Sequence, residues 1–160
     1  MTSPALPIED LAALLAPEAR VLGLDVGTKT IGLALSDITR SIATPYKTLR
    51  RTKFTADAQA LGEIVGSNQV GGLVIGLPIN LNGTEGPRAQ STRAFARNLV
   101  AHVSVPMTFW DERLSTVAVE RHLIEADASR KRRAEVIDRM AAAYILQGAL
   151  DRLRRIAQQG

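Results

Sequence analysis

The stretch VLGLDVGTKTIGLALSD, residues 21–37, decides the fold of this chain. Apolar residues alternate on both sides of the segment Gly27-Thr28-Lys29-Thr30, and this pattern predicts two strands joined by a short turn. Because successive side chains on a strand point to opposite faces, Asp25 lies on the face away from Leu24, among small residues such as Gly32. Asp and Gly are also common in ordinary turns, so Asp-Val-Gly can have a purely structural role. A single acid among glycines on one face of a sheet nevertheless indicates a site where a metal ion or a phosphate approaches.

The composition is that of a folded, basic protein. The chain has 160 residues, of which 46% are hydrophobic, and we expect one domain over residues 1–160 with residues 1–20 as an N-terminal extension. It has no cysteine, which excludes disulfides and thiolate metal sites, and it lacks the pattern of a signal peptide or membrane span, so we expect a cytoplasmic protein. The 20 Lys and Arg against 16 Asp and Glu favour a nucleic-acid partner, although a net charge of +4 also serves solubility.

The rest of the chain alternates between strand and helix patterns. Pro45 places the third strand at a sheet edge, because proline cannot donate to a ladder. After the first two strands we expect, in order, an edge strand over 41–49, a helix from Phe54, a central strand over 72–77, a helix from Pro87, a strand over 105–110, a helix after Ser115, a surface loop over 126–133 and a last helix over about 133–156, with a short helix over 8–15 before them all.

This order predicts an α/β fold built on a mixed five-stranded sheet. An antiparallel meander comes first and parallel strands follow, with helices on both faces of the sheet. Right-handed crossovers bring the carboxyl ends of the first, fourth and fifth strands toward one rim, where ligand sites of α/β proteins usually lie.

Carboxylates from distant parts of the sequence are expected at that rim. They are Asp25, the pair Asp111-Glu112 after the last strand, and Asp138 on the final helix. Hard oxygen ligands suit Mg²⁺ or Mn²⁺, and two such ions can cleave a phosphodiester, whereas neither histidine has a partner at zinc-ligand spacing. Strand alternation puts Asp111 and Glu112 on opposite faces, so one of the two faces the metal position, and the alternation does not decide which. These acids also have purely structural interpretations. Asp111 and Glu112 can belong to a salt-bridged loop, and the helix dipole favours an acid such as Asp138 near a helix N-terminus.

Four segments in order, LGLDVGTKTIGLALSD, VIGLPINLNGTEGPRAQ, FWDERLST and IEADASRKRRAEVIDRMAAAYILQ, resemble the YqgF/RuvX family of RNase H-like proteins. That family comprises Holliday junction resolvases or pre-16S rRNA nucleases, and the resemblance runs from about Val21 to Asp151. It implies a ribonuclease H-like sheet and metal-dependent cleavage of structured nucleic acid. It also implies that Asp25, Glu112 and Asp138 are the catalytic and metal-binding acids for Mg²⁺ or Mn²⁺.

The expected nucleic-acid contacts are mostly cations. Arg88, Arg93 and Arg97 lie off the apolar stripe of their helix and should face solvent or a polyanion. Related resolvases take a carboxylate from the end of the fourth strand, where this chain has the neutral Asn80, so Glu112 would have to compensate. The residues expected to contact nucleic acid are Lys29, Asn80, Arg88, Arg113, Arg130, Lys131, Arg132 and Arg133.

Four functions are compatible with these patterns. The first is an endonuclease that matures the 5′ end of the small-subunit ribosomal RNA precursor, and the second is a nuclease that resolves four-way DNA junctions. The third is a nucleic-acid-binding protein without catalysis. The fourth is half of an actin-like kinase, which ranks last because the chain is short for a second lobe. The sequence does not separate RNA from DNA, or a monomer from a homodimer.

Overall fold

The fold is organised around one mixed sheet of five strands. A computed structural model describes residues 4–114 and 130–159, with side chains of the last helix described from residue 136. The sheet has the order β3-β2-β1-β4-β5, in which β1, β4 and β5 are parallel and β2 is antiparallel to both its neighbours. The strands are β1 (Arg20–Val26), β2 (Thr30–Ser36), β3 (Ala43–Arg50), β4 (Val70–Leu77) and β5 (Met107–Asp111).

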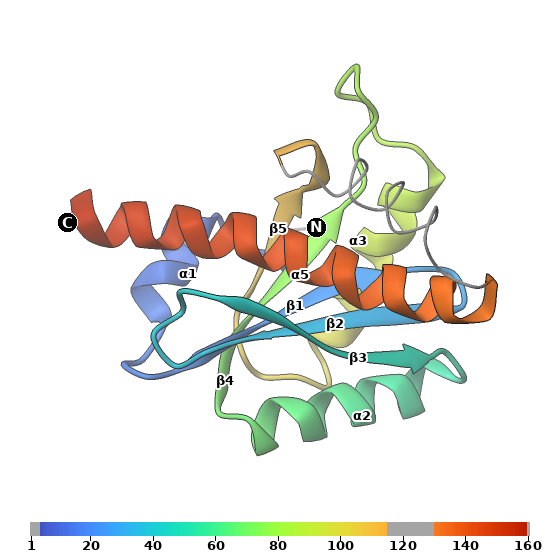
Figure 1. Cartoon of the computed structure of the whole chain (residues 1–160), viewed down its shortest axis with the longest axis horizontal. Coiled ribbons are helices and arrows are strands. Elements are labelled where there is room, and N and C mark those ends of the chain that lie inside the picture. The colour runs from blue at the N-terminus through green and yellow to red at the C-terminus, as the bar shows by residue number, and fades with distance from the viewer. Residues whose placement is uncertain (1–3, 115–129, 160) are drawn as a thin grey trace.

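Helices cover both faces of this sheet. Helix α5 (Arg130–Gln159) crosses one face, and α1 (Ile8–Leu14) packs against it, whereas α2 (Phe54–Ser67) and α3 (Pro87–Leu99) cover the other face (Figure 1). A short 3₁₀ helix, η1 (Glu112–Leu114), follows β5 directly. The predicted mixed five-stranded sheet with helices on both faces, and β3 at its edge, is confirmed.

The two faces follow from the alternation in β1 and β2. Leu22 and Leu24 belong to the core cluster that includes residues of α2 and α3, whereas Val21 belongs to the cluster formed with α5. The α5 side of that second cluster contains small buried residues, among them Ala142 and Ala149, which let the helix lie close to the strands. The predicted face of Asp25 is therefore the face that α5 covers.

Several element boundaries differ from those expected. Strand β5 begins at Met107 rather than at residue 105, because Pro106 has no N–H for the ladder, although its carbonyl accepts a hydrogen bond of 2.9 Å from the Leu73 N–H. Helix α5 begins at Arg130, so residues 130–132 are helical and not part of the predicted loop, in keeping with the high helix propensity of Arg and Lys. The helix expected after Ser115, and residues 126–129 of the loop, lie outside the described residues. No helix in the described ranges combines the length and the apolar character needed to cross a membrane.

Candidate active site

Asp25 lies between two glycines in the middle of the sheet. It pairs with Gly32 across the β1–β2 ladder, and on the other side the pairing of Leu24 with Ile75 brings the next residues, Asp25 and Gly76, side by side. Neighbouring residues of a ladder share a face, so these three, which we call the glycine-flanked row, lie on the face covered by α5. Asp25 is only 5% exposed, and the space that side chains at the two glycines would take is filled by other parts of the chain.

Helix α5 reaches the row at Asp138. A Cβ atom added to Gly32 would lie 2.0 Å from the Asp138 carbonyl oxygen, so only glycine permits this approach of the helix backbone to β2. The Thr30 hydroxyl donates a hydrogen bond to Oδ2 of Asp138, which ties the acid to the first residue of β2. Close packing and this hydrogen bond together place Asp138 beside the Gly32 end of the row.

Glu112 occupies the other end of the row. Its Oε1 atom lies 2.9 Å from the position that a Cβ on Gly76 would take, so its carboxylate lies over that glycine, next to Asp25. Asp111 is engaged elsewhere, because the Arg113 guanidinium donates to its carboxylate with an Nη2 to Oδ2 distance of 2.7 Å. These hydrogen bonds hold the pKa of Asp111 below its usual value. Of the two neighbouring acids, Glu112 is therefore the one that lies at the row.

The carboxylate oxygens at the row are of the kind that bind a hard divalent cation. Within residues 4–114 and 136–159, no three His, Cys, Asp or Glu side chains are close enough to hold one ion as a group. Mg²⁺ is usually bound through one or two carboxylates, with waters and substrate phosphates as the other ligands. Asp25 and the Glu112 carboxylate that lies over Gly76 fit that mode of binding, whereas Asp138 is engaged with Thr30.

The loop after β4 is held by its own hydrogen bonds. The Asn80 backbone N–H donates to the Thr84 carbonyl at 2.9 Å, and its side-chain amide donates to the Thr84 hydroxyl at 3.0 Å. Arg93 of α3 binds Glu85 through two hydrogen bonds of 2.6 and 2.8 Å, which lower the pKa of Glu85, and its guanidinium packs over the Phe109 ring. Arg93 therefore anchors the loop, and the prediction that it faces solvent or a polyanion is wrong.

The predicted cationic contacts have different surroundings. Lys29 is exposed in the β1–β2 turn, and Arg88 is exposed in the first turn of α3. Arg113 forms a salt bridge with Asp111, so part of its charge is already neutralised. Arg130, Lys131, Arg132 and Arg133 lie in the first turn of α5, and their side chains fall outside the described part of the chain.

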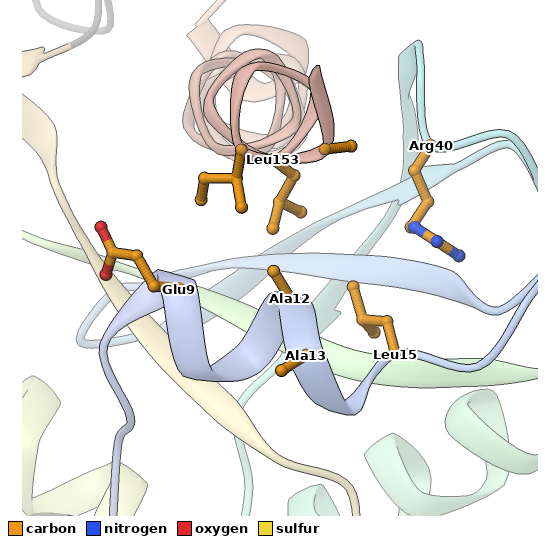
Figure 2. A pocket seen from close by; sticks show the side chains of 8 residues that line it. Glu9, Ala12, Ala13, Leu15, Arg40 and Leu153 are labelled. Carbon is orange, nitrogen blue, oxygen red and sulfur yellow. The ribbon is translucent and has the colours of Figure 1, made fainter. Parts of the chain in front are cut away.

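Two hollows of the described surface have linings that do not include the row. One of about 270 Å³ lies between α1 and the C-terminal half of α5, with Glu9 at one side and Arg40 at the other (Figure 2). Leu153 points into it from α5, and Ala12 and Leu15 line it from the α1 side. Another, of about 510 Å³, lies beside β5 and is lined by residues that include Phe109 and Asp111. None of the three row residues, nor Glu112 or Asp138, lines either hollow.

The sheet order and its helices are those of the ribonuclease H-like fold, the fold of RuvC. A RuvC structure from Thermus thermophilus in complex with a Holliday junction substrate superposes with a TM-score of 0.55, at 11% identity, over 85% of this chain and 96% of that one. A second Thermus thermophilus RuvC structure gives a TM-score of 0.53 at 12% identity, covering 85% of this chain and 97% of the other. At such low identity this likeness concerns the fold alone.

The chain belongs to the RuvX family, whose model, described as a Holliday junction resolvase, matches residues 19–152. A relative from Paracoccus denitrificans is 65% identical over 147 residues, which cover 92% of this chain and 93% of the relative. One from Methylocella silvestris is 58% identical over 156 residues, covering 98% of this chain and 97% of the relative. Both relatives bear the name "Putative pre-16S rRNA nuclease". The predicted family and fold are therefore confirmed.

Proposed function

We propose that this chain is an endonuclease that uses Mg²⁺ or Mn²⁺ to cleave structured nucleic acid, and that its substrate is the 5′ end of the 16S ribosomal RNA precursor. The observation that carries the chemistry is the buried Asp25 between Gly32 and Gly76, with the Glu112 carboxylate over Gly76. The name shared by relatives that are 65% and 58% identical supports the choice of RNA. Such a reaction would take place in the cytoplasm, where ribosomes are assembled.

The residues of the row suit distinct tasks in phosphodiester cleavage. Asp25 and Glu112 would hold the divalent ion, and Asp138 would complete the acidic site from α5. When bound, such an ion activates a water and stabilises the leaving oxygen. Gly32 lets the α5 backbone approach β2, Gly76 leaves space for the Glu112 carboxylate, and Thr30 orients Asp138. Lys29 and Arg88 are exposed and would contact phosphates, whereas Arg113 does so at the cost of its Asp111 salt bridge.

A side-by-side cleavage assay tests both the activity and the substrate. The purified full chain should cut a precursor RNA that spans the 5′ end of the 16S sequence when Mn²⁺ or Mg²⁺ is added, and it should not cut in EDTA. A four-way DNA junction is the second substrate, because the family model carries the description of a Holliday junction resolvase. Strong preference for the junction would overturn the choice of RNA. Salt-sensitive binding without cleavage under any divalent ion would instead favour a non-catalytic binding protein.

A methyl group added at Gly76 is expected to lower the cleavage rate strongly and the stability of the fold only moderately. In Gly76→Ala the new Cβ would lie 2.4 Å from Ile145 Cδ1 and 2.9 Å from Glu112 Oε1, both of which are ends of flexible side chains. They can move, so we expect a loss of about 1–2 kcal/mol in the free energy of unfolding. Because Glu112 is displaced from Asp25, the cleavage rate should fall by about 10²-fold.

The matched control for this variant is Gly62→Ala. A Cβ at Gly62 would meet nothing closer than the His102 carbonyl oxygen, at 3.7 Å, so this helix should accept the methyl group and cleavage should be unchanged. Denaturant unfolding and initial cleavage rates measure the two effects. A Gly76→Ala protein that cuts at the wild-type rate would contradict the role proposed for Glu112.

A further inference from the structure

The outer end of the sheet beside the row carries Arg50, a cation that has no task in the proposed function. Arg50, the last residue of β3, pairs with Thr30 of β2 across their antiparallel ladder. Paired side chains share a face and their Cβ atoms lie roughly 5 Å apart. Because Thr30 holds Asp138, Arg50 lies on the acidic face of the sheet, one residue pair away from an acid of the proposed site.

Two more cations lie at this end of the molecule. Lys29 lies in the β1–β2 turn, and Lys53 immediately precedes α2. All three side chains are exposed. Within the described ranges, no acidic side chain forms a salt bridge with any of them. Their charges are therefore not neutralised by any acidic side chain in the described part of the chain.

The backbone that carries these cations is firmly held. The Arg51 N–H donates to the Lys29 carbonyl at 2.8 Å, and its guanidinium donates to the Gly27 carbonyl at 2.6 Å while it lies over the Phe95 ring. The buried carboxylate of Asp57 accepts hydrogen bonds of 3.1 Å from both the N–H and the hydroxyl of Thr52. Arg51 and Asp57 thus fix the β1–β2 turn against the β3–α2 connection, so the three exposed cations are presented on a rigid frame.

We propose that Lys29, Arg50 and Lys53 form a phosphate-binding edge that holds the sugar-phosphate backbone of the nucleic acid as it leaves the glycine-flanked row. This inference rests on the proposed function, and it adds Arg50 and Lys53 to the residues that bind the substrate. Guanidinium and ammonium groups contact phosphates without reading bases, so the edge contributes affinity and register rather than sequence preference. The bound strand passes the β1–β2 turn, which in Figure 1 lies at the same end of the sheet as the start of α2.

The salt dependence of binding tests this edge. Arg50→Gln combined with Lys53→Gln removes two cations, and Arg154→Gln combined with Arg155→Gln makes the same charge change on exposed residues near the C-terminal end of α5, on the opposite side of the molecule (Figure 1). Affinity for the precursor RNA and for a DNA duplex of equal length is measured in EDTA over a range of salt concentrations. The logarithm of the binding constant falls linearly with the logarithm of the salt concentration. Each lost phosphate contact makes this negative slope shallower by about 0.7 for a single strand and 0.9 for a duplex.

We expect the slope of the edge variant to become shallower by the equivalent of about two contacts with both probes, and that of the control variant to stay at the wild-type value. Arg50→Lys combined with Lys53→Gln keeps one of the two cations and should therefore recover one contact. This variant separates the loss of charge from a folding defect. An edge variant with the wild-type slope and affinity would overturn the inference while leaving the proposed nuclease intact. A wild-type protein that neither binds nor cuts either nucleic acid would refute the proposed function, and the edge with it.

Discussion

Replacing Asp25 with asparagine is expected to lower the metal-dependent cleavage rate by about 10²-fold or more, with the fold intact. Asparagine has the shape of aspartate but no charge, so the row keeps its packing between Gly32 and Gly76 and loses a ligand for the cation. The side chain is 5% exposed, and removing a buried charge relieves a desolvation cost rather than adding one. We therefore expect a melting temperature within a few degrees of the wild type in EDTA.

The same variant gives a readout that does not depend on cleavage. An ion that binds the folded chain raises its stability by mass action, so Mn²⁺ should raise the wild-type melting temperature and should raise that of Asp25→Asn less. Asp10→Asn makes the same chemical change on an exposed residue of α1 and should behave like the wild type in both assays. Wild-type cleavage by Asp25→Asn, or an equal Mn²⁺ shift in the two proteins, would refute the role proposed for Asp25.

The alternation of residues in β1 and β2 was enough to predict much of this site. It placed Asp25 on the face away from Leu24 and put Gly32 on the same face, and the structure has both arrangements. The strand and helix order likewise predicted that β1, β4 and β5 are parallel, which brings the ends of β1 and β5 to one rim. Local periodicity carries this information because a strand has only two faces.

Contacts between distant segments were not predictable in the same way. The hydrogen bond from Thr30 to Asp138 joins residues 108 positions apart, and it depends on where α5 crosses β2. Thr30 lies two residues before Gly32, so the alternation of β2 places it on the same face as Asp25. The alternation does not reveal that Asp138 is its hydrogen-bond partner. Arg93 was misjudged for a similar reason, since an apolar stripe on α3 does not reveal that the loop after β4 brings Glu85 to its guanidinium.

The choice between Asp111 and Glu112 needed the path of the chain after β5. Strand alternation correctly separates their directions, yet β5 ends at Asp111 and the chain turns at once into the 3₁₀ helix Glu112–Leu114. Arg113, on that turn, donates its backbone N–H and its side chain to Asp111, which leaves Glu112 to point over Gly76. A local turn therefore decides which acid lies beside Asp25.

Gly32→Ala is expected to be the most destabilising single methyl addition to the row. The new Cβ would lie 2.0 Å from the Asp138 carbonyl oxygen and 2.3 Å from its carbonyl carbon, and these backbone atoms cannot rotate away. Helix α5 would have to move off β2, where its small residues now pack. We expect the free energy of unfolding to fall by about 3 kcal/mol or more and cleavage to fall with it, because α5 carries Asp138.

Gly66→Ala is the matched control, since it adds the same methyl group to the last turn of α2, where nothing lies within 4 Å of the new Cβ. There the methyl group should raise the free energy of unfolding by about 0.5 kcal/mol, because alanine is the better helix former. Denaturant unfolding of the two variants measures the difference. A Gly32→Ala protein as stable as the wild type would mean that α5 does not contact β2 at this point, and the placement of Asp138 beside the Gly32 end of the row would lose its structural basis.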